Sequence, residues 1–191
     1  MARYAIILGG GRSERMGRDK RALVLDGHSL LSLAVRACGD RERVVVVSPD
    51  LPADVDASKV ILTLEDPPYG GPVAGTAAGL AALAPAQPDD EVLLLACDLP
   101  HAAAVVDALD GSPMGPDGVC LLDAEAYPQY LAGRYRHSAL AAALAAAGEP
   151  RGVSVRRLMR GLDLAQRSAP AIASDIDTPD DARGAGIDPA G

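Results

Sequence analysis

Residues 4–23 read YAIILGGGRSERMGRDKRAL, in which an apolar run ends on three glycines and a group of cations follows. The run 4–8 predicts a buried strand, because short apolar runs are typical of strands covered on both faces. The glycines let backbone N–H groups approach a ligand closely. Residues 12–21 hold five cations against two acids, a local net charge of +3 in a chain whose net charge is −8. A small anionic ligand therefore fits this segment better than a polymer does.

The composition limits the class of protein. A chain of 191 residues is long enough for one α/β domain, and with no Phe or Trp its core must consist mainly of Leu, Val, Ile and Ala. The acidic balance argues against binding to nucleic acid or to an anionic membrane. No apolar run reaches the roughly 20 residues of a membrane helix, and no signal peptide is visible. Three cysteines without metal-type spacing indicate buried thiols, so we expect a cytoplasmic protein.

Apolar runs alternate with helical patterns along the chain. The predicted strands are 4–8, 43–48, 60–64, 92–97, 119–122 and 129–135, and the predicted helices are 30–37 (capped by Ser29), 72–83, 102–109, 138–146 and 153–160. This alternation predicts a three-layer α/β/α sandwich on a mainly parallel sheet. We expect one domain over 1–182 and a frayed tail over 183–191. Because ligands bind beyond the carboxyl ends of such strands, the segments after Leu8, Leu64 and Cys97 are candidate site segments.

The first of these segments carries a resemblance to a known family. LGGGRSERMGRDK, residues 8–20, resembles the signature L-[AG]-G-G-x-S-x-R-M-G-x-D-K of the molybdenum cofactor guanylyltransferases, in the wider Rossmann-like nucleotidyltransferase family. The resemblance implies that the segment wraps the phosphates of GTP, with Arg15 and Lys20 as catalytic cations. The residues that it assigns to the nucleotide here are Leu8, Gly9, Gly10, Gly11, Ser13 and Lys20. Without the resemblance, a tight turn with surface cations is the simpler interpretation.

The second segment, residues 65–80, reads EDPPYGGPVAGTAAGL. In the family, a G-P-[LV]-A-G turn lies beside the guanine and an upstream aspartate contacts the nucleoside. The resemblance therefore implies nucleotide contacts from Gly71, Pro72 and Gly75, with Asp66 as the acid. Taken alone, a proline-rich loop before a helix of small residues explains the segment equally well.

The third segment reads LLLACDLP, residues 93–100, and it ends a strand on Asp98. A carboxylate at this edge is a hard ligand suited to Mg²⁺, which takes one or two carboxylates and completes its coordination with phosphate and water. The family's C-D-[ML]-P motif implies the same metal role for Asp98. The alternative is an N-cap for the helix over 102–109, for which Asp98 lies too early.

Three further segments resemble the family. SDIDTPDDA, residues 174–182, resembles N-[IV]-N-T-P-E-[DE]. It makes Asp177 a second metal or acceptor ligand and Asp175 a weaker one, although Thr178 also suits a helix start. PQYLAGRYR, residues 128–136, implies an acceptor side with Gln129, Arg134 and Tyr135. SVRRLMRGL, residues 154–162, carries three arginines that form either a solvated helix face or a bay for a pterin phosphate.

Together these matches imply Mg²⁺-dependent transfer of GMP from GTP to the terminal phosphate of molybdopterin or molybdenum-molybdopterin, with release of pyrophosphate. Proteins that deliver the pterin are conceivable partners. Three alternatives stay open: a cytidylyltransferase for molybdopterin, a sugar or isoprenoid phosphate nucleotidyltransferase, and a nucleotide-binding module without turnover. None of the three histidines lies in a pattern typical of a catalytic triad.

Overall fold

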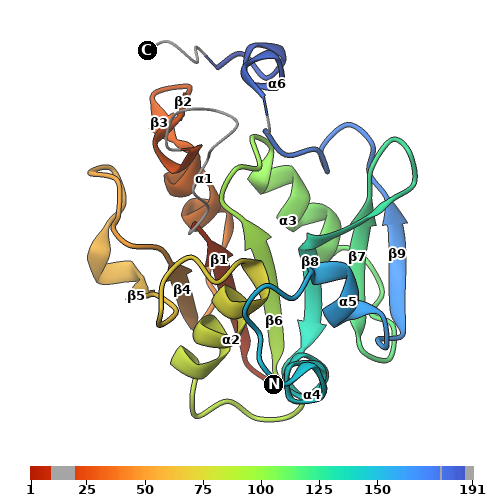
Figure 1. The fold of residues 1–191 in the computed structure, drawn as a ribbon. Coiled ribbons are helices and arrows are strands. Elements are labelled where there is room, and N and C mark those ends of the chain that lie inside the picture. Colours follow the sequence, from red (N-terminus) through yellow and green to blue (C-terminus); the bar gives the residue numbers. More distant parts are fainter. Residues whose placement is uncertain (10–19, 177, 188–191) are drawn as a thin grey trace.

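The computed structural model describes residues 1–9, 20–176 and 178–187, and these residues form a seven-stranded sheet with helices on both faces (Figure 1). The strand order is β5-β4-β1-β6-β8-β7-β9. The strands are β1 Arg3–Leu8, β4 Arg43–Val47, β5 Ile61–Thr63, β6 Glu91–Ala96, β7 Gly118–Leu122, β8 Pro128–Arg136 and β9 Leu164–Ser168. Strand β8 runs antiparallel to both of its neighbours, and the other pairs in the sheet are parallel.

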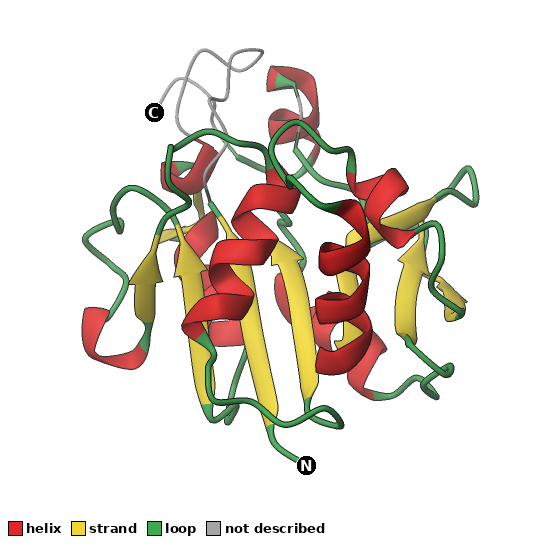
Figure 2. Ribbon diagram, turned by 60° about the horizontal axis from the view of Figure 1, so that its bottom comes forward, coloured by secondary structure: helices red, strands yellow, loops and turns green. Residues whose placement is uncertain are grey.

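All helices except the last form the two outer layers of the sandwich (Figure 2), and the last lies beyond the ends of the strands (Figure 1). The helices are α1 Leu30–Ala37, α2 Pro72–Ala82, α3 Ala102–Asp110, α4 His137–Ala147, α5 Val155–Met159 and α6 Pro179–Gly184, with short 3₁₀ turns η1 Lys20–Ala22 and η2 Ala57–Lys59. Helices α1 and α3 cover one face, and α2, α4 and α5 cover the other. A small hairpin, β2 Val24–Leu25 and β3 His28–Ser29, leads into α1. The predicted three-layer sandwich on a mainly parallel sheet is confirmed.

Alternation along the strands produces the two apolar cores. In β1, Ala5 and Ile7 are fully buried on the α1–α3 face, whereas Tyr4 and Ile6 are buried on the α2 face. Cys38, Cys97 and Cys120 are buried free thiols, as the sequence predicts, and burial raises the pKa of Cys38 to about 12. Within the described part of the chain, no helix combines the length and apolar character that a bilayer crossing needs.

The N-terminus of α1 has the predicted cap. The Ser29 side chain accepts a hydrogen bond from the Ser32 backbone N–H. Asp54 in turn accepts hydrogen bonds from the Ser29 backbone N–H (2.8 Å) and hydroxyl (2.7 Å). Desolvation opposes ionisation of Asp54, but these hydrogen bonds outweigh it and lower the pKa of the carboxyl. The Asp54 carboxylate, which lies outside the helix, therefore fixes the start of α1.

Several parts of the structure differ from the sequence-based expectation, among them the β2–β3 hairpin, which was not predicted. Strand β9 was not among the predicted strands, because its exposed second half offers no apolar pattern to detect. The tail expected to fray from residue 183 is in part ordered. Helix α6 extends to Gly184, and the Ile187 side chain is 2% exposed. Residues 188–191 lie outside the described residues.

The expectation that Arg134 and Tyr135 face an acceptor is wrong, because β8 is a central strand. Tyr135 is fully buried and its hydroxyl donates to the Tyr130 carbonyl at 2.7 Å. Arg134 donates to a Glu91 carboxylate oxygen at 2.9 Å and to the Ser112 carbonyl at 2.8 Å, and it is 9% exposed. Arg134 connects β8 to β6 and to the loop after α3, and Tyr135 is bonded within β8, so the motif marks a structural position in this protein.

Helix α2 lies close to β1 because Gly79 has no side chain. A Cβ atom at residue 79 would lie 2.6 Å from Ile6 Cγ2, which is fully buried in β1. We expect Gly79→Ala to lower the free energy of unfolding by about 1–3 kcal/mol, since the helix or the strand must shift. Urea denaturation measures the loss. Gly161→Ala is the control, because a Cβ there meets no atom within 4 Å, and its effect should stay within about 0.5 kcal/mol. Equal stability of the two variants would contradict this account.

The buried Arg134–Glu91 pair gives a second prediction. Arg134→Met leaves the Glu91 carboxylate buried without its cation, which should cost about 3–5 kcal/mol of unfolding free energy. The double variant Arg134→Met with Glu91→Gln removes the stranded charge and should recover most of that loss. Chemical denaturation of the two variants makes the comparison. If the double variant is no more stable than Arg134→Met alone, the ion pair is not the source of the cost.

Candidate active site

Strands β4, β1 and β6 are neighbours, and their carboxyl ends lie side by side. This end of the sheet is called the carboxyl edge below. Leu8 pairs with Val47 of β4 on one side and with Ala96 of β6 on the other. Beyond the strands, the Gly9 N–H donates to the Val47 carbonyl at 2.8 Å, and the Cys97 N–H donates to the Leu8 carbonyl at 3.0 Å. The chain that leaves β1 and the chain that leaves β6 therefore begin side by side.

Lys20 and Asp98 meet at this edge although 78 positions separate them in sequence. The Lys20 ammonium lies 3.0 Å from Asp98 Oδ2, and the two side chains are 15% and 13% exposed. Lys20 begins the η1 turn, and Asp98 follows β6 by two residues. A pair this sheltered from water attracts more strongly than a surface pair, because solvent screens it less. The structure thus brings together Lys20, one of the two expected catalytic cations, and Asp98, the expected metal ligand.

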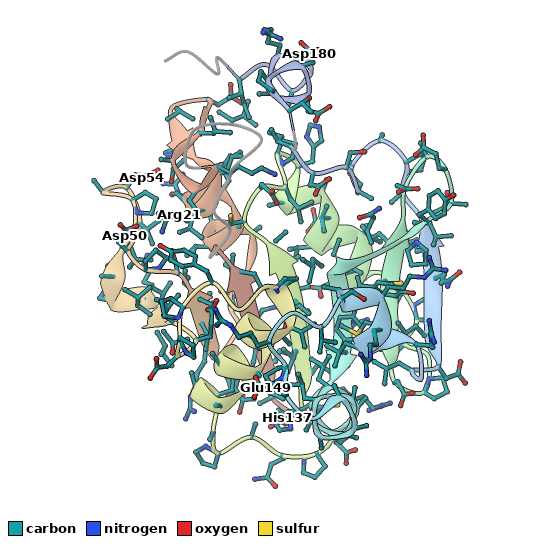
Figure 3. The ribbon with its side chains drawn as sticks, in the orientation of Figure 1. Arg21, Asp50, Asp54, His137, Glu149 and Asp180 are labelled. Carbon is teal, nitrogen blue, oxygen red and sulfur yellow. The ribbon has the colours of Figure 1, made fainter. Side chains whose placement is uncertain are left out.

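Arg21, Ser48 and Asp50 form a polar cluster next to Gly9 that the sequence analysis did not assign to the site. The Arg21 guanidinium donates to the Ser48 hydroxyl at 2.5 Å and to an Asp50 carboxylate oxygen at 2.7 Å. A Cβ atom on Gly9 would lie 3.2 Å from Arg21 Cδ and 3.3 Å from Ser48 Cβ. Figure 3 shows Arg21 and Asp50 on the same side of the molecule. Arg21 directly follows Lys20 in the sequence, and this adjacency is the signal that could have identified the cluster.

The segment after β5 leads into α2, whose first turns lie against the end of β1. Gly71 precedes the first turn of α2 with φ +92°, a conformation that favours glycine, and Pro72 begins the helix. A Cβ atom on Gly75 would approach Leu8 Cδ2 to 3.3 Å, so a small residue there lets α2 lie against the end of β1. The G-P-V-A-G segment is therefore packed against the end of β1.

The acid that organises this segment is Glu65, the residue before the expected Asp66. Asp66 is exposed, whereas Glu65 is 9% exposed and one of its carboxylate oxygens accepts a hydrogen bond from the Gly70 N–H at 3.1 Å. The other oxygen of Glu65 is buried without a hydrogen-bond partner. Sequence reasoning missed Glu65 because adjacent acids cannot be ranked without knowing which one the chain buries.

A pocket of about 210 Å³ lies on the other side of β6. Ala96 and Leu99 line it from the chain around Asp98, Gln129 and Ala132 from β8, Val155 from α5, and Asp175 from the segment before α6. The Gln129 side-chain amide donates to Asp123 at 2.6 Å, which fixes its orientation. The expected acceptor residue Gln129 and the weaker candidate Asp175 thus share one pocket.

Some of the remaining residues that the sequence analysis singled out can be placed in the structure, and others cannot. Gly10, Gly11, Ser13, Arg15 and Asp177 lie outside the described residues. The three arginines of the 154–162 segment are exposed on α5 or at its end, while Leu158 and Met159 are buried. His101, which precedes α3, is exposed, and neither His28 nor His137 lines the pocket.

The described residues offer one carboxylate that fits a magnesium ion at this edge. No group of three or more His, Cys, Asp or Glu side chains that could hold a metal occurs in residues 1–9, 20–176 and 178–187. Asp98 alone fits Mg²⁺ nevertheless, because this ion is commonly held by one or two carboxylates together with substrate phosphates and water. The same Asp98 oxygen now contacts the Lys20 ammonium, so one cation can replace another there.

Comparison with known proteins gives consistent matches. Residues 5–168 match the family model described as a MobA-like NTP transferase domain. A protein of Chloroflexus aggregans named probable molybdenum cofactor guanylyltransferase is 35% identical, with coverage of 95% of this chain and 92% of that protein. A protein of the same name from Synechococcus elongatus is 40% identical over 102 residues. That match covers 52% of each chain, so for several curated relatives the match spans only about half of their length.

Solved structures share the fold at lower identity. The molybdopterin-guanine dinucleotide biosynthesis protein A of Archaeoglobus fulgidus superposes with a TM-score of 0.64 and 22% identity, over 95% of this chain and 96% of that one. The 2-C-methyl-D-erythritol 4-phosphate cytidylyltransferase of Francisella tularensis gives 0.69 at 15% identity, over 97% and 99%. At these identities the likeness concerns the fold alone.

The sequence match and the geometry point the same way. The family model covers most of the sheet, from β1 to the end of β9, and the segments after β1 and β6 meet where a nucleotide would lie in such a sheet. This chain belongs to the family of MobA-like NTP transferase domains.

Proposed function

We propose that this protein transfers GMP from GTP to the terminal phosphate of molybdopterin or its molybdenum-bound form. The observation that carries the proposal is the contact of the Lys20 ammonium with Asp98 at the shared end of β1 and β6. The curated relative that matches nearly the whole chain bears a guanylyltransferase name, which supports the choice of reaction. The chemistry requires a cation for the phosphates and a hard ligand for a metal at one place, and this edge offers both.

The reaction needs no general base. A phosphate oxygen of the acceptor is already an anion at neutral pH, and it attacks the α-phosphorus of GTP in line. The bond between the α-phosphorus and the bridging oxygen breaks, and pyrophosphate leaves with the electron pair. The protein must therefore position two anions and stabilise the charge that develops on the leaving group. Lys20 suits the second task, and the family resemblance assigns the first to the glycine-rich segment 8–20.

Asp98 would hold Mg²⁺ together with the nucleotide. When bound, the metal ion polarises phosphate oxygens and offsets charge on the pyrophosphate. In the structure, Lys20 neutralises the same carboxylate. A triphosphate carries more negative charge than one aspartate, so we propose that Lys20 turns from Asp98 to the phosphates as the nucleotide arrives.

The pocket between β6, β8 and α5 is the proposed acceptor site. Apolar atoms from Ala96, Leu99 and Val155 suit the faces of a flat heterocycle, while the Gln129 side chain supplies a polar contact. Val155 begins the helix that carries Arg156 and Arg157, both exposed. These arginines follow Val155, a pocket residue, in the sequence, and we propose that they hold an acceptor phosphate.

The nucleotide preference is tested by thermal shift with GTP, CTP, ATP and UTP in the presence of Mg²⁺. We expect GTP to raise the melting temperature most, because a ligand stabilises the folded state in proportion to its binding free energy. A larger shift with CTP would replace the guanine assignment by cytosine. No shift with any of the four would remove the proposed function.

The role of Lys20 is tested by Lys20→Ala, which we expect to lower turnover at least tenfold with the fold intact. The reason is that charge on the triphosphate loses a partly buried cation. Lys59→Ala is the matched control, because Lys59 is 75% exposed on η2 and lies 4.0 Å from Asp56. Pyrophosphate release from GTP and molybdopterin measures both variants. Unchanged turnover in Lys20→Ala would exclude Lys20 from the reaction, and nucleotide binding without release by the unmodified protein would indicate a binding module.

A further inference from the structure

A third, small apolar core lies above the carboxyl edge of the sheet and joins distant segments. It consists of Leu23, Leu30, Ile176, Ala182 and Ile187, each at most 6% exposed, and is called the C-terminal cluster below. Figure 1 shows α6 at the same end of the molecule as the β2–β3 hairpin, beyond the ends of the strands. Two of its members come from the segment that follows the first loop, and the other three from the end of the described chain.

The cluster is connected to Lys20 through backbone hydrogen bonds. The Leu23 N–H donates to the Lys20 carbonyl at 3.3 Å, which closes the η1 turn. The Leu30 N–H donates to the Leu23 carbonyl at 2.9 Å. Leu23 therefore lies between the turn that carries Lys20 and the helix that follows the hairpin.

The same cluster is connected to Asp98. The Ile176 N–H donates to the Asp98 carbonyl at 3.2 Å, and the Ile176 side chain is 1% exposed. The two members of the Lys20–Asp98 pair are thus attached to one apolar core from opposite sides. A displacement of that core would move the backbone of both residues.

The short elements around Lys20 depend on contacts with the rest of the chain. Arg21 of the same turn bonds to Ser48 and Asp50, and the C-terminal cluster supplies the apolar contacts. The η1 turn has three residues and buries none of them, and the hairpin has strands of two residues each. Elements of this size are marginal in water unless they pack on something else. The buried side chains next to them are Leu23 and Leu30, both in the C-terminal cluster.

Ile187 closes the cluster from the far end of the chain. Its N–H donates to the Ala182 carbonyl at 2.8 Å, directly after α6. A capping box formed by Thr178 and Asp181 starts that helix, so the sequence itself fixes the helix at its first turn. Helix α6 has one buried residue, Ala182, and Ile187 adds a larger apolar side chain.

We propose that Ile187, through Leu23, is a positioning residue that holds the backbone of Lys20 in place beside Asp98. The C-terminal segment then serves as a brace for the phosphate side of the active site. The part of the inference that concerns GTP rests on the proposed function, whereas the mechanical coupling does not.

The test uses the full chain with Ile187→Ala, the milder Ile187→Val, and Leu109→Ala as control. Leu109 is fully buried near the end of α3, and the neighbouring Asp110 forms an ion pair with Arg3 at the start of β1, on the opposite edge of the sheet. Amide hydrogen exchange without ligand is followed at Leu23, Leu30 and Ile176, whose N–H groups make the connecting hydrogen bonds. Calorimetry then gives the dissociation constant for GTP with Mg²⁺.

We expect at least tenfold faster exchange at the three amides in Ile187→Ala, with at least a threefold weaker affinity for GTP. Ile187→Val should lie between this variant and the unmodified chain, and it carries the test if Ile187→Ala does not fold. Leu109→Ala should lower the melting temperature without either effect. Unchanged exchange at the three amides overturns the brace, and so does faster exchange with an unchanged dissociation constant. If the unmodified chain binds no nucleotide, the proposed function fails, and the exchange rates alone then decide the brace.

Discussion

The parallel pairing of β1 with β6 is the constraint on which the site depends. Their register ends with Leu8 opposite Ala96, and one further hydrogen bond, from the Cys97 N–H to the Leu8 carbonyl, continues it beyond the strands. This alignment decides where Asp98 emerges from the sheet and which loop it faces. Had the register shifted by one residue, the side chain after Cys97 would point to the other face, because side chains alternate along a strand.

Charge compensation is the second theme of the site. An acidic chain concentrates cations near its glycine-rich segment, and at least two of them contact carboxylates: Lys20 binds Asp98, and Arg21 binds Asp50. Pairing of this kind keeps a partly buried charge from remaining isolated. It also means that an incoming anion competes with aspartates for the cations, so affinity depends on how much more charge the ligand offers.

The sequence was sufficient for features that depend on a local pattern. Strand and helix positions follow from apolar periodicity, and the cap at Ser29 follows from residue type, so the layers were predictable. Arg134 and Tyr135 were misinterpreted, since a motif does not tell which side chains of a central strand enter the core. Glu65 and Arg21 were missed because their importance depends on burial and on partners brought close by the fold. The order of residues 183–187 was missed for the same reason, since Ile187 finds its partners about 160 positions earlier in the chain.

The position of the C-terminal cluster has a consequence for protein engineering. A fusion protein in which a linker replaces residues 185–187 would lack Ile187, so the C-terminal cluster would lose one of the apolar side chains that pack with Leu23 and Leu30. Such a chimera would still contain the sheet, both main cores and the helices that flank them. It could be expressed and purified normally and nevertheless hold Lys20 less firmly beside Asp98, so a linker that begins beyond residue 187 is the safer design.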